Sequence, residues 1–119
     1  MSGPKRRRRT QINPGRLAAG RALLAVERGA HAEDMLASLA PPEGPDRRLA
    51  WHLVLGVLRR QGSLDHRLAE VSGRPLRKVD PPARVALRLG LFEQVESRTA
   101  PHAAVDQAVE LCRHLGGRR

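Results

Sequence analysis

The 119-residue sequence has little of several residue types that many functions require. A single cysteine excludes both an intramolecular disulfide and a cysteine zinc cluster. One tryptophan, one phenylalanine and no tyrosine are too few rings to stack a series of successive bases. No apolar run approaches the roughly 18 residues of a membrane helix, and no hydrophobic segment follows the basic N-terminus as in a secretory signal. We therefore predict a soluble, cytoplasmic protein.

Signatures of enzymatic chemistry are missing as well. The glycines never form a nucleotide-binding loop, and no two of the five histidines have the helical spacing of metal ligands. Cys112 lies on an apolar stripe and His52 in the most hydrophobic segment, so packing is favoured over catalysis for both. Trp51 lies in the same hydrophobic segment, and for it packing is favoured over a stacking platform. We predict that the chain is not an enzyme and uses no cofactor and no metal.

Positive charge is what the sequence has in excess. Lysine and arginine number 22 against 12 acidic residues, which gives a net charge of +10. Five basic residues form one run, namely Lys5, Arg6, Arg7, Arg8 and Arg9. Arginine forks match phosphate oxygens, so a polyanion is the expected partner. A purely solubilising role for this run is the alternative, and genome base composition can explain part of the arginine excess.

Helical periodicity of apolar residues begins at Asn13, whereas residues 1–12 show none. Asn13 and Pro14 fit the cap and the first turn of a helix. Further helices are predicted over 32–39, 45–60, from Ser63 to a loop at Gly73, 81–95 and 101–115. No segment alternates with the period of a strand. The sequence therefore predicts a disordered basic arm over 1–12 and a compact, all-α bundle of about six helices over 13–119.

The same pattern predicts helix ends and buried faces. Gly62 is expected to break the third helix, with Ser63 capping the fourth and Val71 facing the core. Thr99 is the expected cap of the last helix. The apolar stripe of that helix is predicted to contain Val105, Ala108, Val109 and Cys112.

Other arginines extend the basic character into the helical region. Arg16 and Arg21 lie in the first helix, and further arginines occupy predicted helix ends and one shared face: Arg47, Arg48, Arg59, Arg60, Arg84 and Arg88. A helix C-terminus already favours cations, so a structural role for Arg59 and Arg60 is as well supported as a binding role. The candidate phosphate-binding residues are Lys5, Arg6, Arg7, Arg8, Arg9, Arg16, Arg21, Arg59 and Arg60.

Four segments carry a recognisable pattern in order along the chain: PGRLAAGRALLAVERGAHA, DRRLAWHLVLGVLRRQGSLDHRL, LRKVDPPARVALRLGLFEQV and APHAAVDQAVELCRHLG. Together they resemble the NusB-like domain family over Arg16 to Gly116. The strings AVERG, GVLRR and PHAAV are most similar to the version fused to RsmB/Sun rRNA 5-methylcytosine methyltransferases. That family normally continues into a further helix with an F-V-N-x-V-L pattern. We therefore expect the last family helix to be missing and an apolar groove to be covered by another chain or copy.

This resemblance implies an RNA-binding helical bundle. In NusB the domain pairs with a small-subunit ribosomal protein and binds single-stranded boxA-type RNA in antitermination and rRNA transcription. By position, its arginine-rich start corresponds to Arg6–Arg9, Arg16 and Arg21. We therefore predict a NusB-type protein that binds single-stranded rRNA or boxA-like RNA. The alternatives are a detached domain or subunit of an RsmB-like rRNA cytosine methyltransferase, and a protein–protein adaptor that pairs with a separate methyltransferase domain or forms a homodimer.

Overall fold

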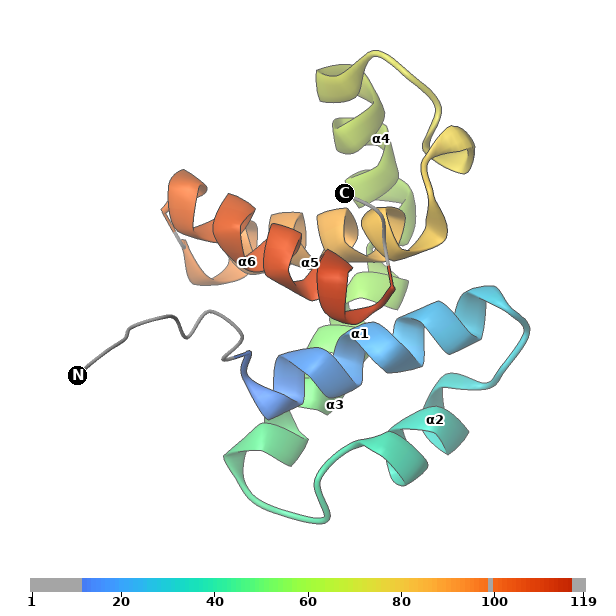
Figure 1. Ribbon diagram of the computed structural model, residues 1–119, viewed down its shortest axis with the longest axis vertical. Helices are drawn as coiled ribbons and strands as arrows, with labels where there is room; N and C mark the ends of the chain where they lie inside the picture. The colour runs from blue at the N-terminus through green and yellow to red at the C-terminus, as the bar shows by residue number, and fades with distance from the viewer. Residues whose placement is uncertain (1–11, 99, 117–119) are drawn as a thin grey trace, which may run out of the picture.

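The computed structural model describes residues 12–98 and 100–116, and these form helices and loops without a strand. The described residues contain six α-helices and a short 3-10 helix, arranged as Figure 1 shows, which confirms the predicted all-α bundle. The elements are α1 (Pro14–Glu27), α2 (Ala32–Leu39), α3 (Pro45–Arg59), α4 (Gln61–Ser72), η1 (Leu76–Lys78), α5 (Pro81–Ser97) and α6 (Pro101–His114). None of the described helices combines the length and apolarity that a membrane span requires.

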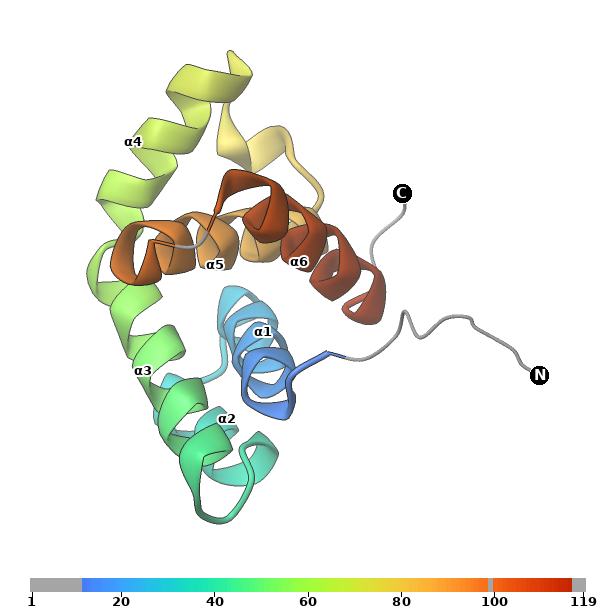
Figure 2. The same ribbon diagram turned by 90° about the vertical axis from the view of Figure 1, so that its left-hand side faces the viewer.

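Helix α1 lies at the centre of the bundle. It packs against α2 and α3 on one side and against α5 and α6 on the other (Figures 1 and 2). Helices α3 and α4 follow one another along one side of the molecule, and the far end of α4 extends beyond the body (Figure 2). This arrangement exposes the outer surface of α3 along most of its length.

The core forms where α3 crosses α5. Helix α5 contributes Val85, Leu89 and Phe92, each no more than 2% exposed, as its sequence spacing predicts. Helix α3 contributes Leu53, Val54 and Val57, together with a glycine, Gly56, that lies directly against the Phe92 ring. The apolar side of α1, including Ala19 and Leu23, closes the core. The aromatic ring therefore takes the space that a side chain at Gly56 would occupy.

The predicted start of α1 is confirmed in detail. The Asn13 side-chain oxygen accepts hydrogen bonds from the backbone nitrogens of Gly15 at 2.7 Å and Arg16 at 3.1 Å. Pro14 occupies the first turn, where its missing N–H costs no helical hydrogen bond. Because these two residues fix the start of α1, they also fix where residues 1–11 join the bundle.

The predicted boundary between α3 and α4 is wrong. Helix α4 begins at Gln61, so Gly62 does not break a helix and Ser63 is not a cap. Arg60 joins the two helices because its N–H donates to the Gly56 carbonyl at 3.1 Å and its carbonyl accepts from Leu64 at 2.9 Å. The prediction for Val71 is also wrong, since it is 87% exposed on the projecting end of α4.

The buried face of α6 agrees only in part with the predicted one. Ala108 and Cys112 pack against the core as predicted, whereas Val105 and Val109 are 60% and 46% exposed. Ala104 and Leu111 are buried instead, and Leu111 packs against Gly20 of α1, where an added Cβ would lie 2.9 Å from the leucine Cδ1. The N-cap of α6 is Ala100 rather than Thr99. Val105 and Val109 thus form an apolar stripe outside the buried one.

Candidate nucleic-acid interface

The predicted basic run, Lys5 to Arg9, lies outside the described residues. The described chain begins at Ile12 and enters α1 beside the N-terminus of α3, where the Asn13 Nδ2 atom lies 3.5 Å from Asp46 Oδ1. The first turn of α3 also contains Arg47 and Arg48. The described chain therefore begins next to the first turn of α3, which contains two arginines and one aspartate.

Arg16 is engaged inside the protein. Its Nε and Nη2 atoms donate to the two carboxylate oxygens of Glu93 on α5, at 2.8 and 2.6 Å. The two side chains are 16% and 11% exposed. This bidentate pair joins α1 to α5, so the guanidinium that the sequence assigned to phosphate is occupied by a carboxylate. The pairing of residues 77 positions apart cannot be recognised from helical spacing.

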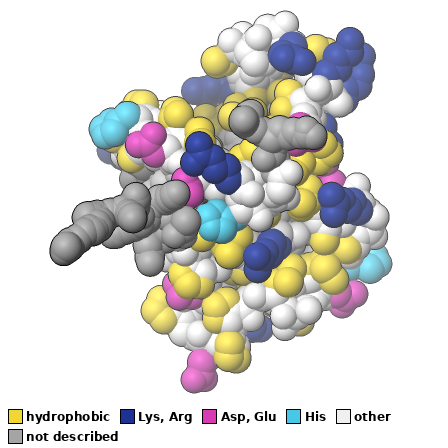
Figure 3. Space-filling view, in the orientation of Figure 1, with side chains coloured by type: hydrophobic (Ala, Val, Ile, Leu, Met, Phe, Trp, Pro, Cys, Tyr) yellow, Lys and Arg dark blue, Asp and Glu magenta, His cyan; other side chains and the backbone are white. Residues whose placement is uncertain are grey.

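Arg21 lies on a different side of α1. It is exposed, and with Arg28 and His114 it lines a hollow of about 420 Å³ between α1 and the end of α6. On the face shown in Figure 3, lysine and arginine side chains are dispersed among apolar ones and do not form one continuous patch. The structure therefore does not bring Arg21 together with Arg16.

Arg84 and Arg88, the predicted pair on α5, form an internal network. Arg84 donates to both carboxylate oxygens of Glu27 at 3.0 and 2.6 Å, and Arg88 donates to Glu27 at 2.8 Å. Arg88 also makes a bidentate contact with Asp65 at 2.7 and 2.8 Å. The hydrogen bond from Arg84 is the largest cause that lowers the pKa of Glu27, with further lowering by the charges of both arginines. Glu27 thus remains a carboxylate to lower pH than an ordinary glutamate.

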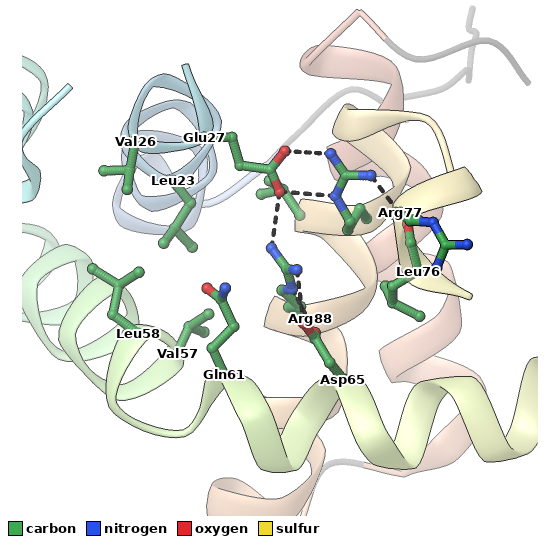
Figure 4. Close-up of a pocket in the computed structure, with 12 residues that line it drawn as sticks. Leu23, Val26, Glu27, Val57, Leu58, Gln61, Asp65, Leu76, Arg77 and Arg88 are labelled. Atoms are coloured by element: carbon green, nitrogen blue, oxygen red, sulfur yellow. Dashed lines mark hydrogen bonds and ion pairs between the residues drawn. The ribbon is translucent and has the colours of Figure 1, made fainter. Parts of the chain in front are cut away.

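This network lies in a cleft of about 490 Å³ between α1, α3, α4 and α5. Figure 4 shows Glu27, Arg88 and Asp65 pointing toward one another from three different helices. Every carboxylate oxygen of Glu27 and Asp65 accepts a hydrogen bond from an arginine. The cleft is therefore braced by mutually neutralising charges and offers little net charge to a ligand.

Arg59 and Arg60 lie exposed at the end of α3. Arg60 pairs with Glu96 at 3.1 Å, and its guanidinium carbon lies 6.0 Å from the centre of the Phe92 ring. The side chain of Arg59 makes no ion pair or hydrogen bond with any other described residue. Of this predicted pair, Arg60 has the structural contacts and Arg59 presents an unneutralised charge.

Sequence reasoning missed an exposed row along α3. Arg48, His52, Leu55 and Arg59 are exposed at spacings of four, three and four residues, which places them on one side of the helix. His52, predicted to pack inside, lies exposed with its ring centre 5.5 Å from that of Phe92. The helical spacing of these residues was the available signal. It was hidden because apolar residues surround His52 in the sequence.

Groups that could hold a metal or act as a nucleophile are scarce in the described part of the chain. No three histidine, cysteine, aspartate or glutamate side chains gather there in a metal-binding arrangement. Burial raises the pKa of the Cys112 thiol, and this disfavours the reactive thiolate.

A family model described as the NusB family matches residues 13–119. The chain belongs to the NusB family. The transcription antitermination protein NusB of Halorhodospira halophila is 38% identical over 91 residues, which cover 74% of this chain and 59% of that protein. The NusB of Frankia casuarinae is 35% identical over 89 residues, covering 73% and 66%. No solved structure matches the chain.

Longer relatives contain the same NusB-like region. The ribosomal RNA small subunit methyltransferase B of Pseudomonas putida is 34% identical over 100 residues, which cover 82% of this chain but 23% of that protein. This chain therefore shares the NusB-like region of this longer relative, whereas it covers more than half of the two NusB proteins above, which are named for antitermination. Both predicted branches of the NusB resemblance are present among its relatives.

Proposed function

We propose that this NusB-family chain is an RNA-binding protein that acts in transcription antitermination and in rRNA transcription or processing, in the cytoplasm. The match to relatives named as NusB antitermination proteins, over about three quarters of the chain, carries this proposal. The basic run Lys5–Arg9 supports it, because arginine forks match the phosphate oxygens of a polyanion. Single-stranded rRNA or boxA-like RNA is the proposed ligand.

A protein partner is part of this proposal. Val95 on α5 and Val105 and Val109 on α6 are exposed large apolar side chains, between 46% and 60% accessible. Exposed apolar surface of this kind is typical of protein contacts. A small-subunit ribosomal protein is the partner that the NusB role requires, and a second copy of the chain is the alternative occupant.

The test compares arginines of the basic run with matched basic residues elsewhere. Replacing Arg6, Arg7, Arg8 and Arg9 by glutamine should weaken binding of a single-stranded RNA and flatten its log–log salt slope by about 3, because each phosphate that an arginine neutralises on a single strand accounts for about 0.7 of the slope. The control replaces Arg74 and Lys78, which are exposed at and near η1. It should change the RNA affinity and the salt slope much less. If the two variants had equal effects, the basic run would contribute to RNA binding only through the overall positive charge of the protein.

A second function is favoured by the Pseudomonas putida relative, whose matched region covers 82% of this chain. In that case the chain is the RNA-binding domain or subunit of an rRNA cytosine methyltransferase and acts with a separate catalytic domain. Binding to rRNA without preference for boxA, together with association with such a catalytic domain, would support this second function. A boxA preference would exclude it as the main role.

A further inference from the structure

A small hollow lies beside the exposed row on α3, at the crossing of α3 and α5. Its volume is about 200 Å³, and Trp51, His52, Arg59, Arg60, Phe92 and Glu96 are among the side chains that line it. The three rings of this group include both aromatic residues of the chain, since it has one tryptophan, one phenylalanine and no tyrosine. Rings and arginines are the groups that hold unpaired nucleotides, through stacking and phosphate contacts.

The packing beneath the hollow keeps its rings in place. Gly56 allows the Phe92 ring to lie directly on α3, and the ring of His52 tilts against Phe92 with centres 5.5 Å apart. The Arg47 guanidinium lies 5.5 Å from the centre of the Trp51 ring. His52 is itself exposed, so one of its faces is available to a base. The His52 ring thus packs against Phe92 on one side and is open to solvent on the other.

Charge around the hollow is unevenly distributed. Glu96 pairs with Arg60 at 3.1 Å on the α5 side, so these two charges largely neutralise one another. The side chain of Arg59 makes no ion pair with another described residue, and Arg48 lies on the same row at the other end of α3. The distance between them along the helix is about 16 Å, at about 1.5 Å per residue. The phosphate of a nucleotide in the hollow therefore fits Arg59, and Arg48 is placed to contact the phosphate of a more distant nucleotide.

One polar atom of a residue that lines the hollow is also unsatisfied. The Nε1 atom of Trp51 is buried and has no hydrogen-bond partner among the described residues. A buried indole N–H without an acceptor is unfavourable. A base carbonyl in the hollow supplies that acceptor only when the Trp51 side chain turns, because the nitrogen is buried in this conformation.

We propose that the hollow between α3 and α5 binds one unpaired nucleotide of a single-stranded RNA, with its base against His52 and Trp51 and its phosphate on Arg59, and that the strand continues along α3 toward Arg48. This inference rests on the proposed RNA-binding function and adds a second contact region to the basic run. A base pair does not fit, because the base must leave its stack to reach the rings. The site therefore selects single strands over duplexes.

The single tryptophan makes this site directly observable. Titration with a labelled single-stranded boxA-like RNA should quench Trp51 fluorescence with the same midpoint as the rise in RNA anisotropy, whereas the RNA annealed to its complement should leave the fluorescence unchanged. The variant His52→Ala combined with Arg59→Gln should bind the single strand roughly fivefold to 100-fold more weakly, as expected when a base no longer stacks. Arg74→Gln is the matched control and should bind like the wild type.

Two outcomes overturn the inference in different ways. A rise in anisotropy without quenching, together with unchanged affinity of the double variant, removes this site but leaves RNA binding by the basic run intact. No rise in anisotropy removes both the site and the proposed function. Crosslinking through 4-thiouridine should attach the RNA to the peptide that contains His52. Crosslinks found only in other peptides would also contradict the site. Thermal unfolding of each variant confirms that the fold is retained, because His52 and Arg59 are both exposed.

Discussion

Replacing Gly56 by alanine should destabilise the protein through a single contact. Gly56 is buried in α3, and the atoms nearest to an added Cβ all belong to the ring of Phe92. That ring is 2% exposed, so it cannot move aside without disturbing the core. Overpacking costs about 1–3 kcal/mol, whereas alanine in a helix gains up to about 1 kcal/mol over glycine. We expect a net decrease of roughly 1–2 kcal/mol in the free energy of unfolding.

Gly62→Ala is the matched control for this substitution. Gly62 lies in α4, and no atom lies within 4 Å of an added Cβ. This variant should gain about 0.5–1 kcal/mol, because the helical preference of alanine acts without a clash. Urea unfolding followed by circular dichroism gives both values on the same scale.

A smaller side chain at position 92 tests whether the Phe92 ring causes this destabilisation. Combining Gly56→Ala with Phe92→Leu should cost less than the sum of the two separate destabilisations, because the smaller side chain leaves room for the new methyl group. Two results would refute this reasoning: a Gly56→Ala variant as stable as Gly62→Ala, or full additivity in the double variant. Either would mean that Phe92 is not held against the α3 backbone.

Two further substitutions test the ion pairs. Glu27→Gln should lower the stability at neutral pH by roughly 2–3 kcal/mol, because Arg84 and Arg88 lose a shared carboxylate in a mostly buried site. Because the pKa of Glu27 is lowered, its ionised form stabilises the fold at pH values above its ordinary pKa of 4.5. This contribution is lost as the pH falls through the lowered pKa. The free energies of unfolding of the wild type and the variant should therefore converge when urea unfolding is repeated at acid pH. Arg16→Gln should lower the melting temperature by several degrees, since about 1 kcal/mol corresponds to about 4–8 °C in a domain of this size. An unchanged melting temperature together with weaker RNA binding would show that Arg16 contacts RNA despite its pairing with Glu93.

The sequence predicted the elements that local chemistry determines. Asn13 and Pro14 define the start of α1 through their own backbone and side-chain preferences, and the row that includes Leu89 and Phe92 is buried as its spacing indicates. Periodicity also showed that α6 is amphipathic. It could not show which of its stripes is buried, because Leu111 is selected by the space above Gly20 of a distant helix.

The candidate site was harder to predict for the same reason. Spacing marked Arg84 and Arg88 as a shared face but could not show that Glu27, 57 positions before Arg84, neutralises them. Charge alone therefore overstated the number of arginines available to RNA. The error for His52 was the opposite one, because it was predicted to be packed inside and is exposed. An apolar neighbourhood in the sequence does not reveal that one side of α3 is left uncovered.

The most direct test of the proposed NusB role is a binding titration with a labelled single-stranded boxA-like RNA and a scrambled control. It is carried out with and without the small-subunit ribosomal protein, at two salt concentrations. We predict tighter binding to the boxA-like RNA, a further gain in affinity when the ribosomal protein is present, and weaker binding at the higher salt. Equal binding to both RNAs, unaffected by the ribosomal protein, would contradict an antitermination role.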